Sequence, residues 1–435
     1  MIKSIKFRYI FSKIEINLII NFILLFASIK CSKNELSVNN FEEVEILQEE
    51  NQNNSEKKIF IFDKIDCVAG FANEFPCKDY DLLSWIPLSF FGSESANDNW
   101  GWTDYNSKRE FVLQGLNDGL AFLDITDPQN VIFVGKLLSA TDPSDWRDVK
   151  IYNNYAFVVS EASNHGLQVF NLNRILDLDE FKVFNEDYTA NDFGNAHNIA
   201  INPSTGFAYI LGSALYEGGP VFYDISVPEK PILKGGFSDT SYIHDAQIIT
   251  YKGIDQNYFE REILFGSNSD GGETNQLIIL DVTDKTNPKL ISKISYSYGG
   301  YTHQGWIDEN HRYFYLGDEL DELRYGNKTR IIIFDLKDLK NPKIHFVHEG
   351  KTNAIDHNLY IKSNKLYLSN YTAGLREFDI QNIENQEIIE EAFFDTYPES
   401  DDASFDGVWN SYPFFESGVI AVSDINRGLF LIKRK

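Results

Sequence analysis

Positively charged residues are scarce in this sequence. Its 435 residues include 39 Lys and Arg against 65 Asp and Glu, which gives a net charge of −26. Such a charge repels nucleic acid and anionic membrane surfaces. The sequence also lacks a G-x-S-x-G motif, a glycine-rich phosphate loop and a linear EF-hand loop. We therefore expect no nucleic-acid partner, and nothing in the sequence favours a serine nucleophile or a nucleotide site.

Cysteine is also rare, and the three cysteines divide into a pair and a single residue. Cys67 and Cys77 are close enough in the sequence to close a short loop, and we predict a disulfide between them. A disulfide persists only in an oxidising compartment, so the pair favours an exported protein. The alternative is a pair of buried free thiols. Cys31 is left over.

The apolar run near the N-terminus, residues 16–29, follows several basic residues and is short for a membrane span. It predicts an export signal over residues 1–30. Because Cys31 follows directly, the segment resembles a bacterial lipoprotein signal, in which this cysteine is lipidated. Lys30 departs from the small residue of such signals, so a plain secretory signal is the alternative. We expect a cell-envelope or outer-surface lipoprotein or an extracellular protein, with the membrane contacted only through a lipid anchor.

Two segments of different composition follow the signal. Residues 31–66 are rich in Glu, Asn and Lys and almost free of aromatic residues, which predicts a flexible tether. From residue 67 to residue 435 the composition does not change again. Aromatic residues make up 14% of the sequence, and together with Val and Ile they favour strands over helices. We expect one β domain over residues 67–435.

This domain repeats a unit of about fifty residues. Each unit starts with His or Asp, continues into an apolar strand, turns, and enters a second strand. The starting residues lie at intervals of 49, 47, 59, 54 and 49. They are Asp148, His197, His244, His303, His357 and Asp406. A seventh unit starts near residue 97, one spacing upstream.

A third strand in each unit ends in most copies at Asp before a turn rich in Asp, Asn and Pro, and a fourth strand follows. Four short strands at this period are typical of a β-propeller blade, which cannot bury both sheet faces without neighbours. Seven third strands predict seven blades. The last unit stops before a fourth strand, so we predict that residues 81–91 close the ring by pairing with the final blade.

The third-strand signature resembles the LVIVD repeat. Longer stretches, among them HDAQIITYKG (244–253) and YTHQGWIDENHRYFYLGDELDE (301–322), resemble the choice-of-anchor B family of exported bacterial proteins. The resemblance covers about residues 67–435. It implies a propeller surface domain that is shared by proteins attached in different ways. It supplies no reaction and no ligand, so function has to be argued from the site.

The first strand of each propeller blade lines the central channel. Four histidines begin the first strands of successive units, so we expect them at one mouth of the channel, with Asp148 and Asp406 on flanking blades. Residues 302–322 form a hairpin that returns to its starting face, which is expected to bring Asp318 and Glu319 beside His303. Imidazole is the commonest ligand of transition metals. The predicted metal ligands are His197, His244, His303, His357, Asp318 and Glu319.

The sequence leaves the metal open among Fe, Zn, Cu and Ca. Acids at the ends of second strands offer oxygen ligands to Ca²⁺, although a solvated acidic rim is the alternative. Tryptophans at the mouth are candidates for stacking on a ligand or for packing between blades. The residues that we expect to bind a ligand are Asp148, Glu161, Trp102, Trp306 and Asp406.

The alternative to these roles is a purely structural one, because His or Asp at a repeated position can bond to the backbone of the next blade and fix the spacing between blades. The function that the sequence favours is a binding module at the cell surface. Its expected partners are a metal ion, a small ligand, or an extracellular protein or glycan, and the protein is expected to be a monomer. The alternative is a metal-dependent enzyme, oxygenase-like or hydrolase-like, that uses the four histidines.

Overall fold

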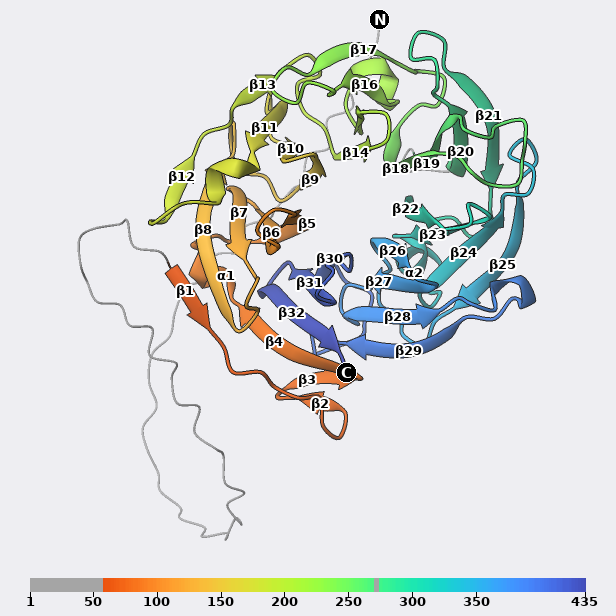
Figure 1. Cartoon of the computed structure of the whole chain (residues 1–435). Coiled ribbons are helices and arrows are strands. Elements are labelled where there is room, and N and C mark those ends of the chain that lie inside the picture. The colour runs from red at the N-terminus through yellow and green to blue at the C-terminus, as the bar shows by residue number, and fades with distance from the viewer. Residues whose placement is uncertain (1–57, 270–273) are drawn as a thin grey trace, which may run out of the picture. The chain divides into compact units, whose positions relative to one another are not determined.

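The computed structural model describes residues 58–269 and 274–435. These residues form seven sheets arranged as blades around a common axis (Figure 1). Each blade contains four antiparallel strands, so the fold is the predicted all-β, seven-bladed propeller. Among the helices of the described residues, none is long and apolar enough to cross a membrane.

The strands follow the repeats seen in the sequence. Blades one to three consist of β5 (Ala96–Asp104), β6 (Arg109–Leu116), β7 (Gly119–Asp124) and β8 (Asn130–Leu138); β9 (Arg147–Tyr152), β10 (Tyr155–Ser160), β11 (Leu167–Asn171) and β13 (Tyr188–Ala190); and β14 (Asn198–Asn202), β15 (Phe207–Leu211), β16 (Val221–Asp224) and β17 (Ile232–Gly236).

Blades four to six consist of β18 (Ile243–Thr250), β19 (Glu262–Ser269), β20 (Asn275–Asp281) and β21 (Lys289–Ser295); β22 (Thr302–Ile307), β23 (Tyr313–Asp318), β24 (Arg330–Asp335) and β25 (Lys343–Glu349); and β26 (Leu359–Lys362), β27 (Lys365–Ser369), β28 (Leu375–Asp379) and β29 (Ile389–Phe394). The seventh blade consists of β30 (Val408–Tyr412), β31 (Val419–Asp424), β32 (Gly428–Arg434) and β4 (Tyr80–Ile86).

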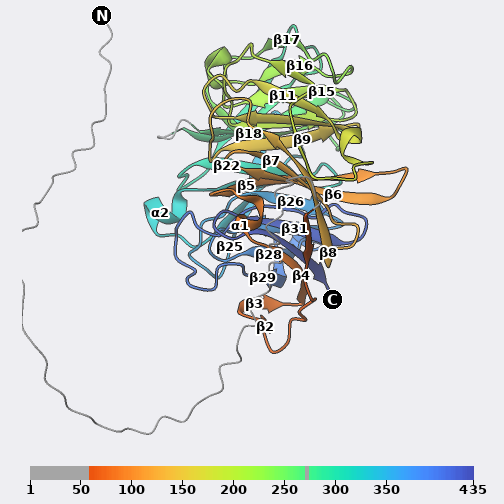
Figure 2. The same cartoon turned by 90° about the vertical axis from the view of Figure 1, so that its left-hand side faces the viewer.

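Short elements complete the chain. The additional strands are β1 (Lys58–Ile61), β2 (Phe71–Ala72), β3 (Phe75–Lys78) and β12 (Lys182–Phe184), and the helices are α1 (Leu88–Phe91) and α2 (Asp321–Tyr325) with the 3-10 turns η1 (Leu172–Ile175), η2 (Leu215–Gly218) and η3 (Ile383–Asn385). In the side view, α2 lies on one face of the ring and the β5–β6 turn on the other (Figure 2).

The third strand of each blade explains the strongest signature in the sequence. The residues of β24 before its terminal Asp335 are buried. Asp335 accepts a hydrogen bond from the backbone nitrogen of Lys337 at 2.8 Å, and Asp281 at the end of β20 accepts one from Thr283 at 3.1 Å. An Asp that bonds two residues ahead turns the chain out of the strand. The repeated Asp therefore marks where each third strand ends.

Apolar side chains join neighbouring blades. Phe122 of β7 stacks on Phe170 of β11 with ring centroids 4.8 Å apart, and Phe265 of β19 stacks on Phe314 of β23 at 5.6 Å. The inner strands β5, β9, β14, β18, β22, β26 and β30 contact one another in turn around the ring. Equivalent residues at the starts of these strands are thereby brought close to the axis.

The ring closes as predicted. β4 pairs antiparallel with β32, and Ile86 lies opposite Leu429. The predicted closing segment, residues 81–91, is a strand only to Ile86, because Pro87 has no amide hydrogen for the sheet and α1 follows. Closure gives the last blade its fourth strand and removes an exposed sheet edge.

Residues before β4 pair with the strands of two further blades. Lys58–Ile61, part of the expected tether, forms β1 and pairs with β8 of blade one, so residues before 67 also belong to the propeller sheets. β3 pairs with β29 of blade six. The predicted disulfide between Cys67 and Cys77 is present and closes the loop that contains β2. The predicted signal peptide, Cys31 and the rest of the tether lie outside the described residues.

Replacing Leu82 by Ala tests the importance of the closing strand. Leu82 of β4 is fully buried, so the substitution leaves a cavity and is expected to lower the free energy of unfolding by about 2–5 kcal/mol. Urea denaturation followed by tryptophan fluorescence measures this loss. Leu290→Ala on β21, where the side chain is 41% exposed, is the matched control and should change stability little. Equal losses of stability in the two variants would show that Leu82 of the closing strand contributes no more than the exposed Leu290.

Candidate metal centre

Four histidine rings form a continuous row on the inner side of blades three to six. His197 precedes β14, His244 lies in β18, His303 lies in β22 and His357 precedes β26. Successive ring centroids are 4.3, 4.3 and 4.2 Å apart. The structure thus brings the four predicted histidines together as neighbours along one arc.

Backbone carbonyls orient two of these rings. Nδ1 of His244 donates to the carbonyl oxygen of His303 at 2.9 Å, and Nδ1 of His357 donates to the carbonyl oxygen of Trp409. A carbonyl only accepts, so Nδ1 carries the proton in both rings and Nε2 keeps its lone pair. This arrangement is the usual one for histidines that bind a metal through Nε2.

Glu319 completes a compact group with two of the histidines. Its carboxylate oxygens lie 3.8 Å from Nε2 of His303 and 3.7 Å from Nε2 of His357. One ligand atom from each of these three residues lies within 4.8 Å of the others. The hydroxyl of Tyr371 donates to Glu319 at 3.0 Å and fixes the carboxylate. Two imidazoles and one carboxylate therefore converge at the ends of three different strands.

Burial keeps these histidines neutral. Burial lowers the pKa of His357 to about 3, and burial together with neighbouring imidazoles holds the pKa values of His244 and His303 well below the usual range. Burial raises the pKa of Glu319 to about 7. Neutral imidazole is the form that binds a metal. Nδ1 of His303 has no hydrogen-bond partner in the described structure.

The group opens toward solvent on one side. The side chains of Glu319 and His197 are 15% and 13% exposed, whereas those of His303 and His357 are 3% exposed. Nδ1 of His197 lies 2.6 Å from a carboxylate oxygen of Glu161, which was expected to bind ligand. Glu161 therefore sits at the end of the histidine row as a partner of the ring that borders solvent.

Asp318 lies beside the group but faces away from it. Its carboxylate accepts hydrogen bonds from the backbone nitrogens of Gly300 and Tyr301 at 2.9 and 2.7 Å and from the hydroxyl of Tyr296 at 2.6 Å. These bonds hold the turn before β22. The two carboxylates thus have different partners, and Glu319 of the adjacent pair is the one that lies with the histidines.

Asp148 and Asp406 lie apart from the histidine row. Asp148 accepts a hydrogen bond from the backbone nitrogen of Ile199 in the next blade at 2.9 Å and is paired with Lys150. Asp406 accepts from Ser404 at 2.7 Å. Asp148 thus makes the contact between neighbouring blades that a purely structural role predicts for such positions.

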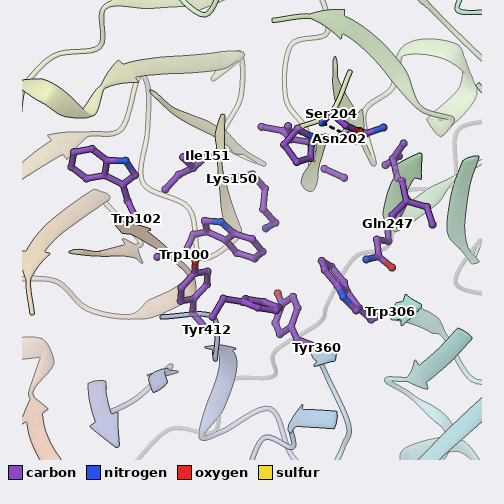
Figure 3. Close-up of a pocket in the computed structure, with 18 of the residues that line it drawn as sticks. Trp100, Trp102, Lys150, Ile151, Asn202, Ser204, Gln247, Trp306, Tyr360 and Tyr412 are labelled. Atoms are coloured by element: carbon purple, nitrogen blue, oxygen red, sulfur yellow. Dashed lines mark hydrogen bonds between the residues drawn. The ribbon is translucent and has the colours of Figure 1, made fainter. Parts of the chain in front are cut away.

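Trp306 and Trp102 line a separate open cavity of about 1120 Å³. Trp306 follows His303 by three residues in β22, which corresponds to about 10 Å along a strand. Figure 3 shows Trp306, Tyr360 and Trp100 around the cavity, and the Tyr360 ring lies 5.1 Å from Trp306 and 5.8 Å from Trp100. The sequence placed the tryptophans at the histidine mouth, and the structure places these side chains toward the other end of the inner strands.

A partly buried lysine lies at the wall of this cavity. Lys150 pairs with Asp148 and, at 3.2 Å, with Asp98, and its ammonium lies 4.6 Å from the centre of the Trp100 ring. Burial alone would lower the pKa of Lys150, but the two carboxylates raise it above its usual value. Burial raises the pKa of nearby Asp245 to about 7. The cavity therefore combines aromatic faces with a buried set of charges.

Sequence reasoning missed several of these residues. Tyr371 reaches Glu319 from a different blade, and Tyr360 lines the cavity from β26. The available signals were modest: Lys150 follows Asp148 by two residues, and Tyr360 follows His357 by three. In both cases the missed residue lies two or three positions after a residue that the repeat had identified.

A family match and a solved structure with a TM-score of 0.53 agree with this fold. The model of the LVIVD repeat family matches residues 272–295. A structure of Kuenenia stuttgartiensis hydrazine synthase is similar at a TM-score of 0.53 and 9% identity, over 77% of this chain and 95% of that chain. A structure of U3-55K is similar at a TM-score of 0.49 and 9% identity, over 81% and 98%. No curated protein matches the sequence.

The class defined by these observations is a seven-bladed β-propeller that contains an LVIVD repeat. At 9% identity the likeness to hydrazine synthase shows the fold alone. Function therefore has to come from the residues of this chain.

Replacing Lys150 by Met tests the buried charges. The change leaves the carboxylates of Asp98 and Asp148 without a cation, and we expect a loss of about 3–5 kcal/mol in unfolding free energy at pH 7. Burial raises the pKa of Asp98 well above its usual value even beside Lys150, and in the variant the pKa of Asp148 should rise above that of the unfolded chain as well. Folding then takes up protons, so the loss is full at neutral pH and shrinks as the pH falls toward 5.

Urea denaturation at pH 7 and pH 5 measures both effects. Lys230→Met, at an exposed lysine, is the control and should show neither. A loss that is the same at both pH values would mean that packing rather than charge is responsible.

Proposed function

We propose that this protein is an exported propeller that binds a transition-metal ion through His303, His357 and Glu319. The observation that carries the proposal is the convergence of three ligand atoms within 4.8 Å, two of them imidazole nitrogens of buried, neutral histidines. His244 and His197 extend the same row and are candidates for further ligands. The bound ion would then present open coordination positions to a small ligand or an extracellular partner.

The donor set selects the kind of metal. Two imidazoles and a carboxylate suit Fe, Zn or Cu, whereas Ca²⁺ takes oxygen ligands only. The same set with open positions occurs in non-haem iron oxygenases and, with zinc, in hydrolases. A metal-dependent enzyme is therefore the second candidate function, and it is favoured by the partial exposure of Glu319 at the mouth.

The aromatic cavity supports binding of a larger molecule. Flat faces of Trp100, Trp306 and Tyr360, beside charged Lys150, suit the apolar face of a sugar or a peptide side chain. A volume of about 1120 Å³ is large enough for such a ligand. We propose that a glycan or a peptide of an extracellular protein binds here, with the propeller acting as a monomer.

The proposed location rests on two observations. The Cys67–Cys77 disulfide requires an oxidising compartment, and the LVIVD match at residues 272–295 is in keeping with the choice-of-anchor B family of exported proteins. We propose that the chain is exported and is attached to the cell envelope through lipidated Cys31.

Elemental analysis tests the metal proposal. Protein purified without chelators and without a polyhistidine tag should contain about one equivalent of Fe, Zn or Cu. The double variant His303→Ala/His357→Ala should lose it, because two of the three proposed ligands are removed. Glu319→Gln should weaken binding at least tenfold, since the amide keeps the shape and removes the charge.

His348→Ala is the matched control, because it removes a histidine from the outer strand β25 and should leave the metal content unchanged. Wild-type protein that binds none of the three metals, either as isolated or after incubation with each ion, would rule the proposal out. Metal binding without any turnover would favour the binding role over the enzyme.

A further inference from the structure

A second group of acidic side chains is buried next to the proposed metal centre. Asp321 and Glu322 lie in α2, and Asp356 lies just before His357. Asp321 and Asp356 are fully buried, and Glu322 is 4% exposed. Ligand oxygens of the three carboxylates lie within 4.8 Å of one another. Three carboxyl groups are thus held together away from water.

Some oxygens of this group have donors. Oδ2 of Asp321 is bound by the guanidinium of Arg330 and, at 3.2 Å, by the side-chain nitrogen of Asn327. Oδ2 of Asp356 accepts from the backbone nitrogen of Asp318 at 2.8 Å. These contacts fix one oxygen of each aspartate.

Four oxygens remain without any hydrogen-bond partner: Oδ1 of Asp321, Oδ1 of Asp356 and both carboxylate oxygens of Glu322. Both oxygens of the buried Glu322 side chain therefore accept no hydrogen bond. Among the described residues, Arg330 is the one cation paired with the three carboxylates. Burying carboxylates without compensation costs several kcal/mol each, so the group requires either protons or a bound cation.

We propose that Asp321, Glu322 and Asp356 bind a hard divalent cation of the Ca²⁺ class. All available donors are oxygens, and no nitrogen or sulfur ligand is present in the group. Glu322 offers both oxygens and each aspartate one, which supplies four of the six to eight oxygen ligands that Ca²⁺ takes. Burial and the neighbouring carboxylates of Asp356 and Asp321 raise the pKa of Glu322 to about 12. Binding of the cation therefore displaces a proton from this carboxyl group.

The position of this ion gives it a structural role. Glu319 lies two residues before Asp321, and His357 directly follows Asp356. A cation held by Asp321, Glu322 and Asp356 would join the two chain segments that carry two of the three proposed transition-metal ligands. Gly317 leaves room for the side chain of Asp356, because a Cβ at position 317 would lie 2.3 Å from Oδ2 of Asp356. This role rests on the proposed function, whereas the Ca²⁺ site itself does not.

Calorimetric titration and thermal denaturation test the cation site. Full-length protein is freed of Ca²⁺ with EGTA, desalted into chelator-free buffer, and titrated with CaCl₂. We expect one equivalent to bind and millimolar Ca²⁺ to raise the melting temperature by several degrees. Mg²⁺ and Mn²⁺ are run in parallel, since both prefer oxygen ligands.

Glu322→Gln sharpens the test. It should abolish the rise in melting temperature with Ca²⁺, because the amide keeps the shape of the carboxyl group but cannot carry its negative charge. Glu349→Gln, at an exposed glutamate of β25, is the matched control and should keep the wild-type response. If none of the three ions binds the wild type, the carboxyls are protonated and the proposal is overturned.

The His303→Ala/His357→Ala variant separates the two metal sites. It should keep its response to Ca²⁺, and loss of that response would assign the ion to the histidine group and overturn the proposal. Wild-type protein should also bind the transition metal more weakly without Ca²⁺ than with it. Equal affinity would refute the structural role of the ion, even where Ca²⁺ binds as expected.

Discussion

The structure depends on the packing of each blade against its two neighbours. A four-stranded sheet exposes two faces, and only a closed ring covers both faces of every blade. Phe122 on Phe170 and Phe265 on Phe314 are examples of this packing. The same packing presses the inner strands together around the axis, so residues at equivalent repeat positions become neighbours. The histidine row is a direct result of the ring.

The histidines of this row can both bond to the next blade and bind a metal, because imidazole has two nitrogens. His244 and His357 each use Nδ1 to hold the backbone of the next blade. Their Nε2 atoms remain free for a ligand. Asp148 and Gln247 make comparable contacts between blades, to the backbone nitrogens of Ile199 and Ile307, without offering a nitrogen ligand. Histidine is the residue type that performs both tasks at one position.

The fold was predictable because its signals are local: a residue that starts each unit and an Asp that ends each third strand. Lys58–Ile61 was not expected as a strand, since it stands outside the repeat and owes its pairing to β8. At the site, the hairpin predicted that acids return beside His303, but the choice of Glu319 over Asp318 depends on which side each faces. Contributions from other blades, such as Tyr371, follow from packing that spacing does not reveal.

The pairing of β4 with β32 has a consequence for the order in which the chain folds. Trp85 of β4 and its partner Arg427 are separated by 342 residues. Hairpins within a blade form in microseconds, whereas closing a loop of this length costs more conformational entropy. The blades can therefore form before β4 pairs with β32. Until that pairing forms, the unpaired edges of β4 and β32 are exposed to pairing with other chains.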